Sequence, residues 1–466
     1  MTSATAAERQ AARTGKAQRL RIGVTANHPR RDLPGMVLTA LELHRAGATA
    51  VLMPAHLSWA DATFADLDAI LTNNARQSTV GGVRWLAGRG LSVFVLDDEG
   101  YLSSERHAAL TNAIAKLDLG STVKGYFVWG EASGKAIAKA DPKLAGKVLA
   151  TGAPRFDLLA PRWRGMLQFD RQGYILLNPN FNGVNPVHGD PERTRRRMLR
   201  DGAWETADLD RLLGDLRQGF AAFLKLCAEL PRRLPHRQFV VRPHPFEDWK
   251  PYESAVAGLP NVHLNTEGPI SPVLAHATHL VHLNCNTSVE ARLLGLPVIQ
   301  AGFLNTPLLQ QQMPIYTGVS VIAESMDDLC RLLDDPAYLA QRDNSSGIFE
   351  QWIRPSFHDC DGFAGRRLAE LLLARTEPRD RRAAQTPGHT PALRRAKLAL
   401  IHAVGTAAVH RVRQMLRPQR KEKAFTVADV RQLVEAYSKQ TGVPVPPVRR
   451  LRSRLTGLPM SAIQIG

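Results

Sequence analysis

The segment FVVRPHP, residues 239–245, decides how the rest of the chain is interpreted. Its first three residues have the apolar character of a short buried strand, and Arg242 and His244 follow where that strand would end. Pro243 and Pro245 fix φ and remove backbone donors, so the two polar side chains stand on a stiff platform. Ligands of open α/β sheets bind outside the carboxyl ends of the strands, and the segment therefore predicts a binding site.

Apolar stretches of strand length alternate with helical spacers on both sides of this segment. The strands of the first half are predicted at 20–26, 48–53, 68–72, 91–96, 125–129 and 147–151. After a break at 162–173, strands are predicted at 174–178, 239–241, 261–264, 279–283, 298–301 and 319–322. Such alternation is typical of parallel α/β sheets. We expect two Rossmann-like domains in series with a cleft between them, followed by a helix at 362–375.

The 466 residues are too many for one ordinary core, so the chain is divided into parts. The predicted parts are a disordered N-terminus at 1–19, an N-terminal domain at 20–165, a C-terminal domain at 170–345, a helical return segment at 346–375 and a basic C-terminal extension at 376–466. Within the extension, residues 391–416 have the pattern of a basic amphipathic helix.

The positive charge of the chain is concentrated in this extension. The net charge is +17, and residues 375–466 contain 19 Lys or Arg against 5 Asp or Glu, which is +14 and leaves +3 for the rest. A basic amphipathic helix favours binding to an anionic inner-membrane surface; a solvated tail or a protein-docking arm is the alternative. A chain that ends near Arg375 is then expected to stay folded. Nucleic acid is not an expected partner, because aromatic residues do not alternate with the basic ones.

The sequence predicts a cytoplasmic protein, peripheral on the inner membrane if the extension binds lipid. The first twenty residues lack the apolar stretch of a signal peptide, and no run approaches the roughly 18 to 20 apolar residues of a membrane span. The four cysteines are far apart and form no CxxC pair, so neither a disulfide framework nor a metal site is expected.

Two groups of charged residues in the first half are candidates for chemistry. Asp97, Asp98 and Glu99 follow the strand predicted at 91–96, and carboxylates this close repel one another, which favours a proton on at least one of them. Their alternative role is to cap a helix. Arg155 and Asp157 follow a Gly-containing turn; they could bind an anionic sugar or supply a nucleophilic carboxylate, or form a structural ion pair.

Polar residues after two strands of the second half are candidates for nucleotide binding. Asn180 lies in the stretch NPNFNGVN at 178–185, which suits sugar or base recognition or a plain turn. The stretch HLNCNTSVEARLLGL at 282–296 predicts a strand end and a helix start whose free N–H groups favour phosphate. Its candidate residues are Asn284, Asn286, Thr287, Ser288 and Glu290. Glu290 could bind a ribose hydroxyl or simply favour the helix start.

Seven motifs occur in the order seen in bacterial surface carbohydrate biosynthesis proteins. They are RDL (31–33), LDDEG (96–100), FVWG (127–130), TGAPRFDLL (151–159), YILLNPNFN (174–182), RPHP (242–245) and NCNTSVEARLLGLPVI (284–299). Together they resemble the retaining β-Kdo glycosyltransferases that use CMP-Kdo and have the two-domain GT-B fold. The resemblance covers about residues 20–340 and leaves the basic extension out.

The resemblance implies an acceptor-side, catalytic N-terminal domain and a C-terminal domain that holds the nucleotide sugar. The implied catalytic residues are Glu99 and Asp157, with Asp98 beside them. The implied nucleotide-sugar-binding residues are Arg242, His244, Asn284, Asn286, Thr287, Ser288 and Glu290. Further cleft residues are Arg31, Asp32, Trp129, Arg155 and Asn180. The chain departs from the family pattern at Asp98, where Glu is common, and at Ala153, where Asn is common.

The predicted function is transfer of a sugar, Kdo in this family, from a CMP-linked or other nucleotide sugar to a glycan or lipid-linked glycan of lipopolysaccharide or capsule. No cofactor or metal is expected, because Arg242, His244 and the helix near Ser288 would neutralise the leaving phosphate. Two alternatives stay open: a nucleotide-sugar 2-epimerase, which needs no acceptor, and a non-catalytic adaptor for polysaccharide assembly or export.

Overall fold

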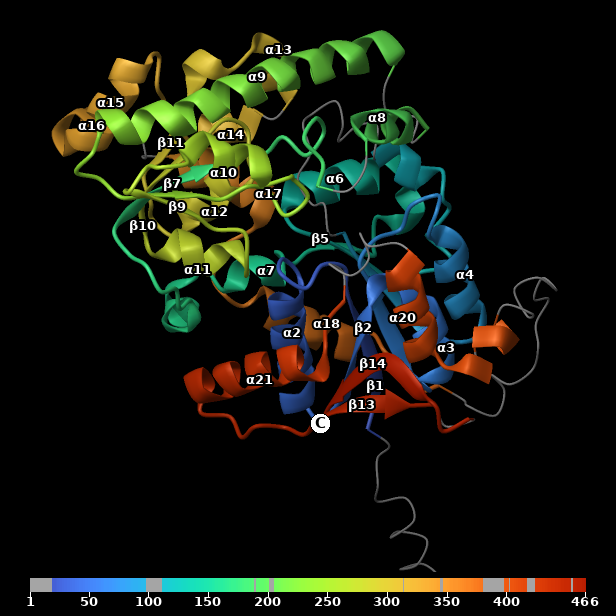
Figure 1. The fold of residues 1–466 in the computed structure, drawn as a ribbon. Helices are drawn as coiled ribbons and strands as arrows, with labels where there is room; N and C mark the ends of the chain where they lie inside the picture. Colours follow the sequence, from blue (N-terminus) through green and yellow to red (C-terminus); the bar gives the residue numbers. More distant parts are fainter. Residues whose placement is uncertain are drawn as a thin grey trace, which may run out of the picture.

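The fold consists of two α/β domains, each built on its own sheet (Figure 1). A computed structural model describes residues 19–97, 111–187, 190–200, 205–312, 314–343, 347–379, 398–401, 403–416, 424–453 and 456–466. The two sheets have eight and six strands and no strand in common. The predicted fold class is confirmed: two Rossmann-like domains and helices in the C-terminal region.

The first sheet contains six parallel strands from the N-terminal half of the chain. They are β1 (Arg21–Ala26), β2 (Thr49–Pro54), β3 (Ala69–Thr72), β4 (Ser92–Leu96), β5 (Gly125–Val128) and β6 (Val148–Ala150). The central strands are buried along almost their whole length because helices cover both faces, which explains their continuous apolar character. The order β2-β1-β3-β4-β5-β6 places all six carboxyl ends at one edge.

Helices pack on both faces of this sheet. They are α2 (Leu33–Arg45), α3 (Ser58–Phe64), α4 (Val80–Gly88), α6 (Glu131–Ala140) and α7 (Pro154–Asp157), joined by the return helix α18 (Ala364–Ala374). Helix α2 touches α7 so closely that a Cβ added at Gly35 would lie 2.5 Å from the backbone of Pro154. Glycine at this position therefore sets where α7 begins, next to the carboxyl edge of the sheet.

The second sheet is entirely parallel, in the order β12-β11-β10-β7-β8-β9. Its strands are β7 (Tyr174–Asn178), β8 (Phe239–Val241), β9 (Val262–Leu264), β10 (Ala277–His282), β11 (Val298–Gln300) and β12 (Val321–Ile322). Its helices are α8 (Pro191–Arg200), α9 (Thr206–Arg233), α10 (Lys250–Val256), α11 (Ile270–Ala275), α12 (Thr287–Leu293), α13 (Pro307–Gln312), α14 (Pro314–Gly318), α15 (Met326–Asp334) and α16 (Pro336–Arg342), with α17 (Arg354–Phe357) leading back to the first domain. The strand order reverses at β7, so ligands are expected at the ends of β7, β8 and β10.

The C-terminal extension is part of the first domain. Its helices are α20 (Thr406–Leu416) and α21 (Val427–Thr441), and it adds two strands, β13 (Val448–Arg452) and β14 (Pro459–Ile465). Strand β14 pairs antiparallel with β2, and β13 pairs antiparallel with β14. The red C-terminal segments of Figure 1 accordingly lie beside the blue N-terminal ones.

This arrangement corrects the expectation that a chain ending near Arg375 stays folded. Ala462 and Ile463 are fully buried in the core of the first domain, and the Tyr437 hydroxyl donates to the carbonyl of Pro34 at 2.9 Å. The extension was predicted to be a separate tail because of its net positive charge. Its short apolar strand, β14, gave too weak a signal in the sequence to indicate that it belongs to the first sheet. None of the described helices is both long and apolar enough to cross a membrane.

Candidate functional site

A cleft of about 230 Å³ lies between the two domains, at the carboxyl ends of both sheets. Residues from the first domain that line it are His28, Arg30, Arg31 and Arg155. Residues from the second domain that line it include Asn178, Asn180, Arg242, His244, Ser271, Asn286, Thr287, Glu290 and Tyr316. Of the predicted nucleotide-sugar residues, Arg242, His244, Asn286, Thr287 and Glu290 thus meet in one place.

His244 lines the cleft as a neutral hydrogen-bond donor. Its Nδ1 accepts the backbone N–H of Phe246 at 3.2 Å, so the proton of the neutral imidazole lies on Nε2. Burial, with smaller contributions from Arg31, His28 and Arg242, lowers the pKa of His244 to about 4. At neutral pH this side chain therefore offers an N–H group without a charge.

Arg242 holds the loop that follows β9. Its guanidinium donates to the backbone carbonyls of Glu267 at 2.6 Å and Gly268 at 2.5 Å, and to the side-chain oxygen of Asn265. Burial lowers the pKa of Arg242 to about 10, which leaves it a cation at neutral pH. Among the described residues, the hydrogen-bond partners of Arg242 are a side-chain amide and two carbonyls, so its positive charge is not cancelled by a carboxylate.

The lining of the cleft is strongly positive. It contains four arginines and one glutamate, a formal charge of +3 that falls to +2 when Asp32, the partner of Arg31, is counted with them. Two of the arginines have carboxylate partners: Arg31 pairs with Asp32 at 2.8 Å, and Arg155 pairs with Glu290. Arg30 instead donates to the carbonyl of Thr266 at 3.0 Å. An anionic ligand would restore the charge balance of this lining.

Arg155 and Glu290 connect the domains across the cleft. Their side chains lie 2.6 Å apart and are 13% and 6% exposed. Arg155 also lies over the rings of Trp129 and Phe156, at 5.4 and 5.0 Å from their centroids. Glu290 was expected to face a ribose or to favour the helix start; in the structure it is held by an arginine of the other domain.

A histidine that the sequence reading missed lies opposite His244. The Nδ1 of His28 accepts the backbone N–H of Arg30 at 3.2 Å, which repeats the contact of His244. The ring of Phe246 lies near both histidines, with centroid distances of 5.7 Å to His28 and 5.5 Å to His244. The sequence contains a signal for this residue, because NHPRR (27–31) follows β1 with a His-Pro pair, as RPHP (242–245) follows β8.

Asn178 and Asn180 link the strand ends beneath the cleft. The Asn178 side chain donates to the carbonyl of Arg242 at 2.8 Å and accepts from the Thr287 hydroxyl. The Asn180 side chain donates to the carbonyl of Asn284 at 3.2 Å. The asparagine-rich stretch after β7 therefore orders the neighbouring loops of the site.

Asn284 and Ser288, both predicted to bind the nucleotide, do not line the cleft. Asn284 donates to the side chain of Asn305 at 2.9 Å, and the buried Ser288 hydroxyl donates to the carbonyl of Cys285 at 2.8 Å. The first-turn N–H groups of Ser288 and Val289 are also engaged, each with a carbonyl 3.1 Å away. The first turn of α12 uses these two donors locally, so neither is free for a ligand, and Asn286 and Thr287 are the residues of this turn that line the cleft.

Asp157, predicted to be catalytic, lies away from the cleft. Its side chain is 1% exposed, and its two oxygens accept the backbone N–H groups of Ala364 at 2.9 Å and Gly365 at 2.8 Å. Burial raises its pKa to about 7. Because α7 is a single turn, Arg155 and Asp157 point in different directions, one to the cleft and the other to the start of α18. In this structure the Asp157 carboxyl group fixes the start of the return helix.

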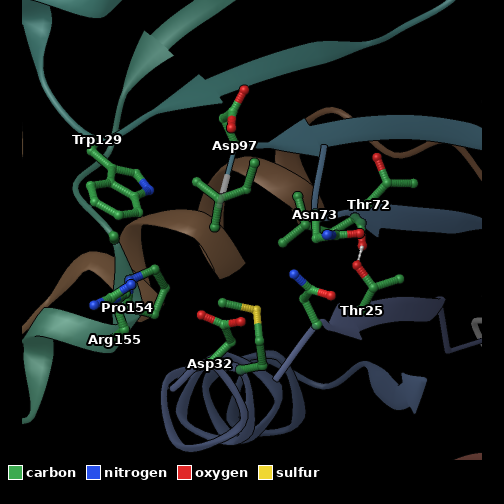
Figure 2. A pocket seen from close by; sticks show the side chains of 13 residues that line it. Thr25, Asp32, Thr72, Asn73, Asp97, Trp129, Pro154 and Arg155 are labelled. Atoms are coloured by element: carbon green, nitrogen blue, oxygen red, sulfur yellow. Dashed lines mark hydrogen bonds between the residues drawn. The ribbon is translucent and has the colours of Figure 1, made fainter. Parts of the chain in front are cut away.

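A second, smaller cavity adjoins the cleft at Arg155, which lines both. Its volume is about 30 Å³, and Figure 2 shows its position at the ends of β1, β3, β4 and β5. Two predicted cleft residues, Asp32 and Trp129, line it together with Asp97. Asp97 is held by Arg76 at 2.7 and 2.8 Å and by the Tyr126 hydroxyl at 3.1 Å. The predicted residues Asp98 and Glu99 lie outside the described residues.

No family model matches the chain, and no curated protein matches its sequence. Solved structures resemble it over most of its length. The UDP-GlcNAc 2-epimerase from Neisseria meningitidis, bound to UDP-GlcNAc, is 14% identical with a TM-score of 0.46, and the match covers 76% of this chain and 99% of that one. A putative UDP-N-acetylglucosamine 2-epimerase from Listeria monocytogenes is 12% identical with a TM-score of 0.48, and the match covers 78% of this chain and 98% of that one. The wall teichoic acid polymerase TagF, in a variant soaked with CDPG, is 11% identical with a TM-score of 0.47, and the match covers 76% of this chain and 88% of that one.

Proposed function

We propose that this chain transfers a sugar from a nucleotide sugar, bound in the interdomain cleft, to a glycan acceptor. The observation that carries the proposal is the positive lining of the cleft, where Arg30 and Arg242 bind uncharged groups among the described residues and His244 lies beside them. A nucleotide sugar brings phosphate, ribose and sugar hydroxyls, which match cations, carbonyls and amides.

The leaving group is assigned to the C-terminal side of the cleft. When the bond between the sugar and the phosphate oxygen breaks, negative charge grows on that oxygen. The fixed charge of Arg242 and the Nε2–H of His244 stabilise this charge more in the transition state than in the ground state. Arg30 reaches the same space from the other domain, so the domains act on one phosphate together.

The acceptor is assigned to the N-terminal side, at the cavity lined by Asp32, Asp97 and Trp129. The acceptor hydroxyl forms the new glycosidic bond and gives its proton to a carboxylate. Asp98 and Glu99 follow Asp97 directly in the sequence, and Glu99 remains our candidate for the carboxylate that acts on the sugar. Kdo as the sugar, CMP as the nucleotide and a lipid-linked surface glycan as the acceptor belong to this proposal. With retention, a covalent adduct on that carboxylate is expected.

One observation favours a second candidate, a nucleotide-sugar 2-epimerase. The cavity next to the cleft holds about 30 Å³, roughly one water molecule, and leaves little room for an acceptor sugar in this conformation. An epimerase acts on the nucleotide sugar alone and needs no such room.

Two measurements test the proposal. A thermal-shift panel of CMP, UDP, GDP and CDP identifies the nucleotide, because a ligand that binds the folded state raises its stability. Nucleotide sugars are then incubated with the protein, with and without surface glycan acceptors, and the products are separated by mass. Transfer that requires the acceptor supports the transferase. Interconversion of the nucleotide sugar without an acceptor replaces it with the epimerase, and binding without turnover replaces both with an adaptor.

A further inference from the structure

One face of the extension exposes an unusual number of large apolar side chains. Leu400, Val404, Val412 and Met415 are 65%, 47%, 52% and 75% exposed, and they are four of the nine exposed large apolar residues of the described chain. Val412 and Met415 are three residues apart on α20 and share one side of it, and Leu400 and Val404 lie in the segment that leads into α20 and ends at Gly405. We call these four exposed residues the α20 face.

The opposite side of α20 is fixed to the first domain. The Thr406 hydroxyl donates to the buried carboxyl group of Asp61 at 2.6 Å. The rings of His410 and His56 are stacked with centroids 4.7 Å apart, and their nitrogens are 2.8 Å apart. Because these contacts hold the inner side, the helix cannot turn to bury the α20 face against its own domain.

Positive charge flanks the α20 face in the sequence. Residues 394–423 contain nine Lys or Arg and one Glu, which is a net +8. A helix with an outward apolar side and flanking cations is the type that lies in the interface of a lipid bilayer, where its apolar side chains enter the acyl boundary and its cations meet anionic headgroups.

We propose that the α20 face docks the protein on an anionic lipid bilayer. A second copy of the chain fits this face poorly, because two-fold pairing would bring a net +8 against another +8. Docking through α20 holds the N-terminal domain at the bilayer, the side to which the acceptor is assigned above. Membrane binding itself does not depend on the proposed chemistry, so either can fail alone.

Flotation of the full chain with vesicles tests the proposal. Vesicles of phosphatidylcholine that also contain phosphatidylglycerol are compared with vesicles of phosphatidylcholine alone, at low and high salt. We expect binding to the anionic vesicles only, weakened by salt. The double variant Val412→Asp/Met415→Asp should reduce binding to the anionic vesicles by roughly tenfold or more, because it removes apolar area and adds charge repulsion.

The matched control is Val445→Asp, which changes an exposed valine of the same extension outside the α20 face (54% exposed). It should bind like the unaltered chain. A milder double variant, Val412→Ser/Met415→Ser, checks the result if the aspartates disturb folding, and thermal unfolding confirms that each variant is folded. Equal binding of both double variants and the control overturns the proposal, as does equal binding to neutral vesicles. A dimer of the unaltered chain that the double variants abolish would assign the face to a second copy.

Discussion

Arg155 and Glu290 form an ion pair of 2.6 Å that joins the two domains at the cleft. Arg155 is supplied by the turn after β6, and Glu290 by the first turn of α12. The pair fixes the separation of the domains at the point where the two cavities adjoin. A ligand that binds Glu290 through a hydroxyl group must share or displace Arg155, so ligand binding and domain position are coupled here.

Removing one partner of this pair should destabilise the protein more than removing both. Glu290→Gln leaves Arg155 buried without its counter-charge, and a broken buried pair costs about 3 kcal/mol or more. Arg155→Met should cost a similar amount, and the double variant should recover part of the loss. Denaturant unfolding of the four proteins gives the coupling energy. Additive losses would show that the two side chains do not support each other.

Replacing His244 should weaken nucleotide binding through loss of one neutral donor. His244→Ala is expected to reduce affinity by roughly tenfold, the value of one hydrogen bond to a charged group. His244→Gln, which keeps an N–H donor, should retain part of it. The control is His236→Ala, since this histidine is on the surface with a side chain 59% exposed. Titration calorimetry with the nucleotide from the thermal-shift panel measures all three, and equal affinity of His244→Ala and the control would exclude His244 from the site.

Asp157→Asn separates a structural from a catalytic role. The asparagine amide can accept only one of the two N–H groups that Asp157 accepts from Ala364 and Gly365, so stability should fall by about 1 to 3 kcal/mol. The kcat of the folded fraction should change less than about threefold, whereas loss of a nucleophile costs several orders of magnitude. Turnover measured well below the unfolding temperature distinguishes the two, and a large loss of kcat without loss of stability would restore Asp157 to catalysis.

The stabilisation contributed by two buried carboxyl groups, Asp61 and Glu247, should decrease as pH rises toward 7. Burial raises the pKa of Asp61 to about 6 and that of Glu247 to about 7, so each carboxyl group takes up its charge at a higher pH in the folded than in the unfolded chain. The stabilisation is therefore complete below the unfolded pKa near 4 and is lost as pH passes 6 to 7. For Asp61 the loss is roughly 3 kcal/mol.

Urea unfolding at pH values about one unit apart, between pH 5 and 8, measures this dependence. A pKa shift of one unit corresponds to about 1.4 kcal/mol in the free energy of unfolding. Glu247→Gln removes one of the titrating groups and should flatten the curve. A stability difference between the unaltered chain and Glu247→Gln that does not change with pH over this range would contradict a raised pKa of Glu247.

Removal of the last two strands should unfold the first domain. A chain that ends at Arg375 loses the buried residues Ala462 and Ile463 and exposes the edge of β2. We expect aggregation or loss of the cooperative unfolding transition, which light scattering and calorimetry would detect. A soluble product with the unfolding temperature of the full chain would show that the extension is dispensable.

The sequence predicts strands and strand-end residues well, because local pattern alone determines where they lie. It does not predict the direction of side chains on short helices, which depends on the packing of distant segments. Strand β8 was predicted because three apolar residues precede RPHP, and His244 lines the cleft because a strand end leaves its side chain at that edge of the sheet. That Asp157 lies outside the cleft could not be predicted, because a single-turn helix sends residues two apart to different sides and nothing local reveals which side is the cleft. That the Ser288 hydroxyl donates to a carbonyl three residues away depends on the exact start of α12, which the sequence does not define.

The pairing of β14 with β2 also has a consequence for synthesis on the ribosome. Strand β6 ends at Ala150 and β14 begins at Pro459, so the first sheet waits for about 300 residues after its sixth strand has been made. At about 5 to 20 residues per second, the edge of β2 stays open for roughly 15 to 60 seconds. The second domain is complete before the first one is, and the nascent chain must keep the buried residues of β2 from pairing with other strands until its final segment arrives.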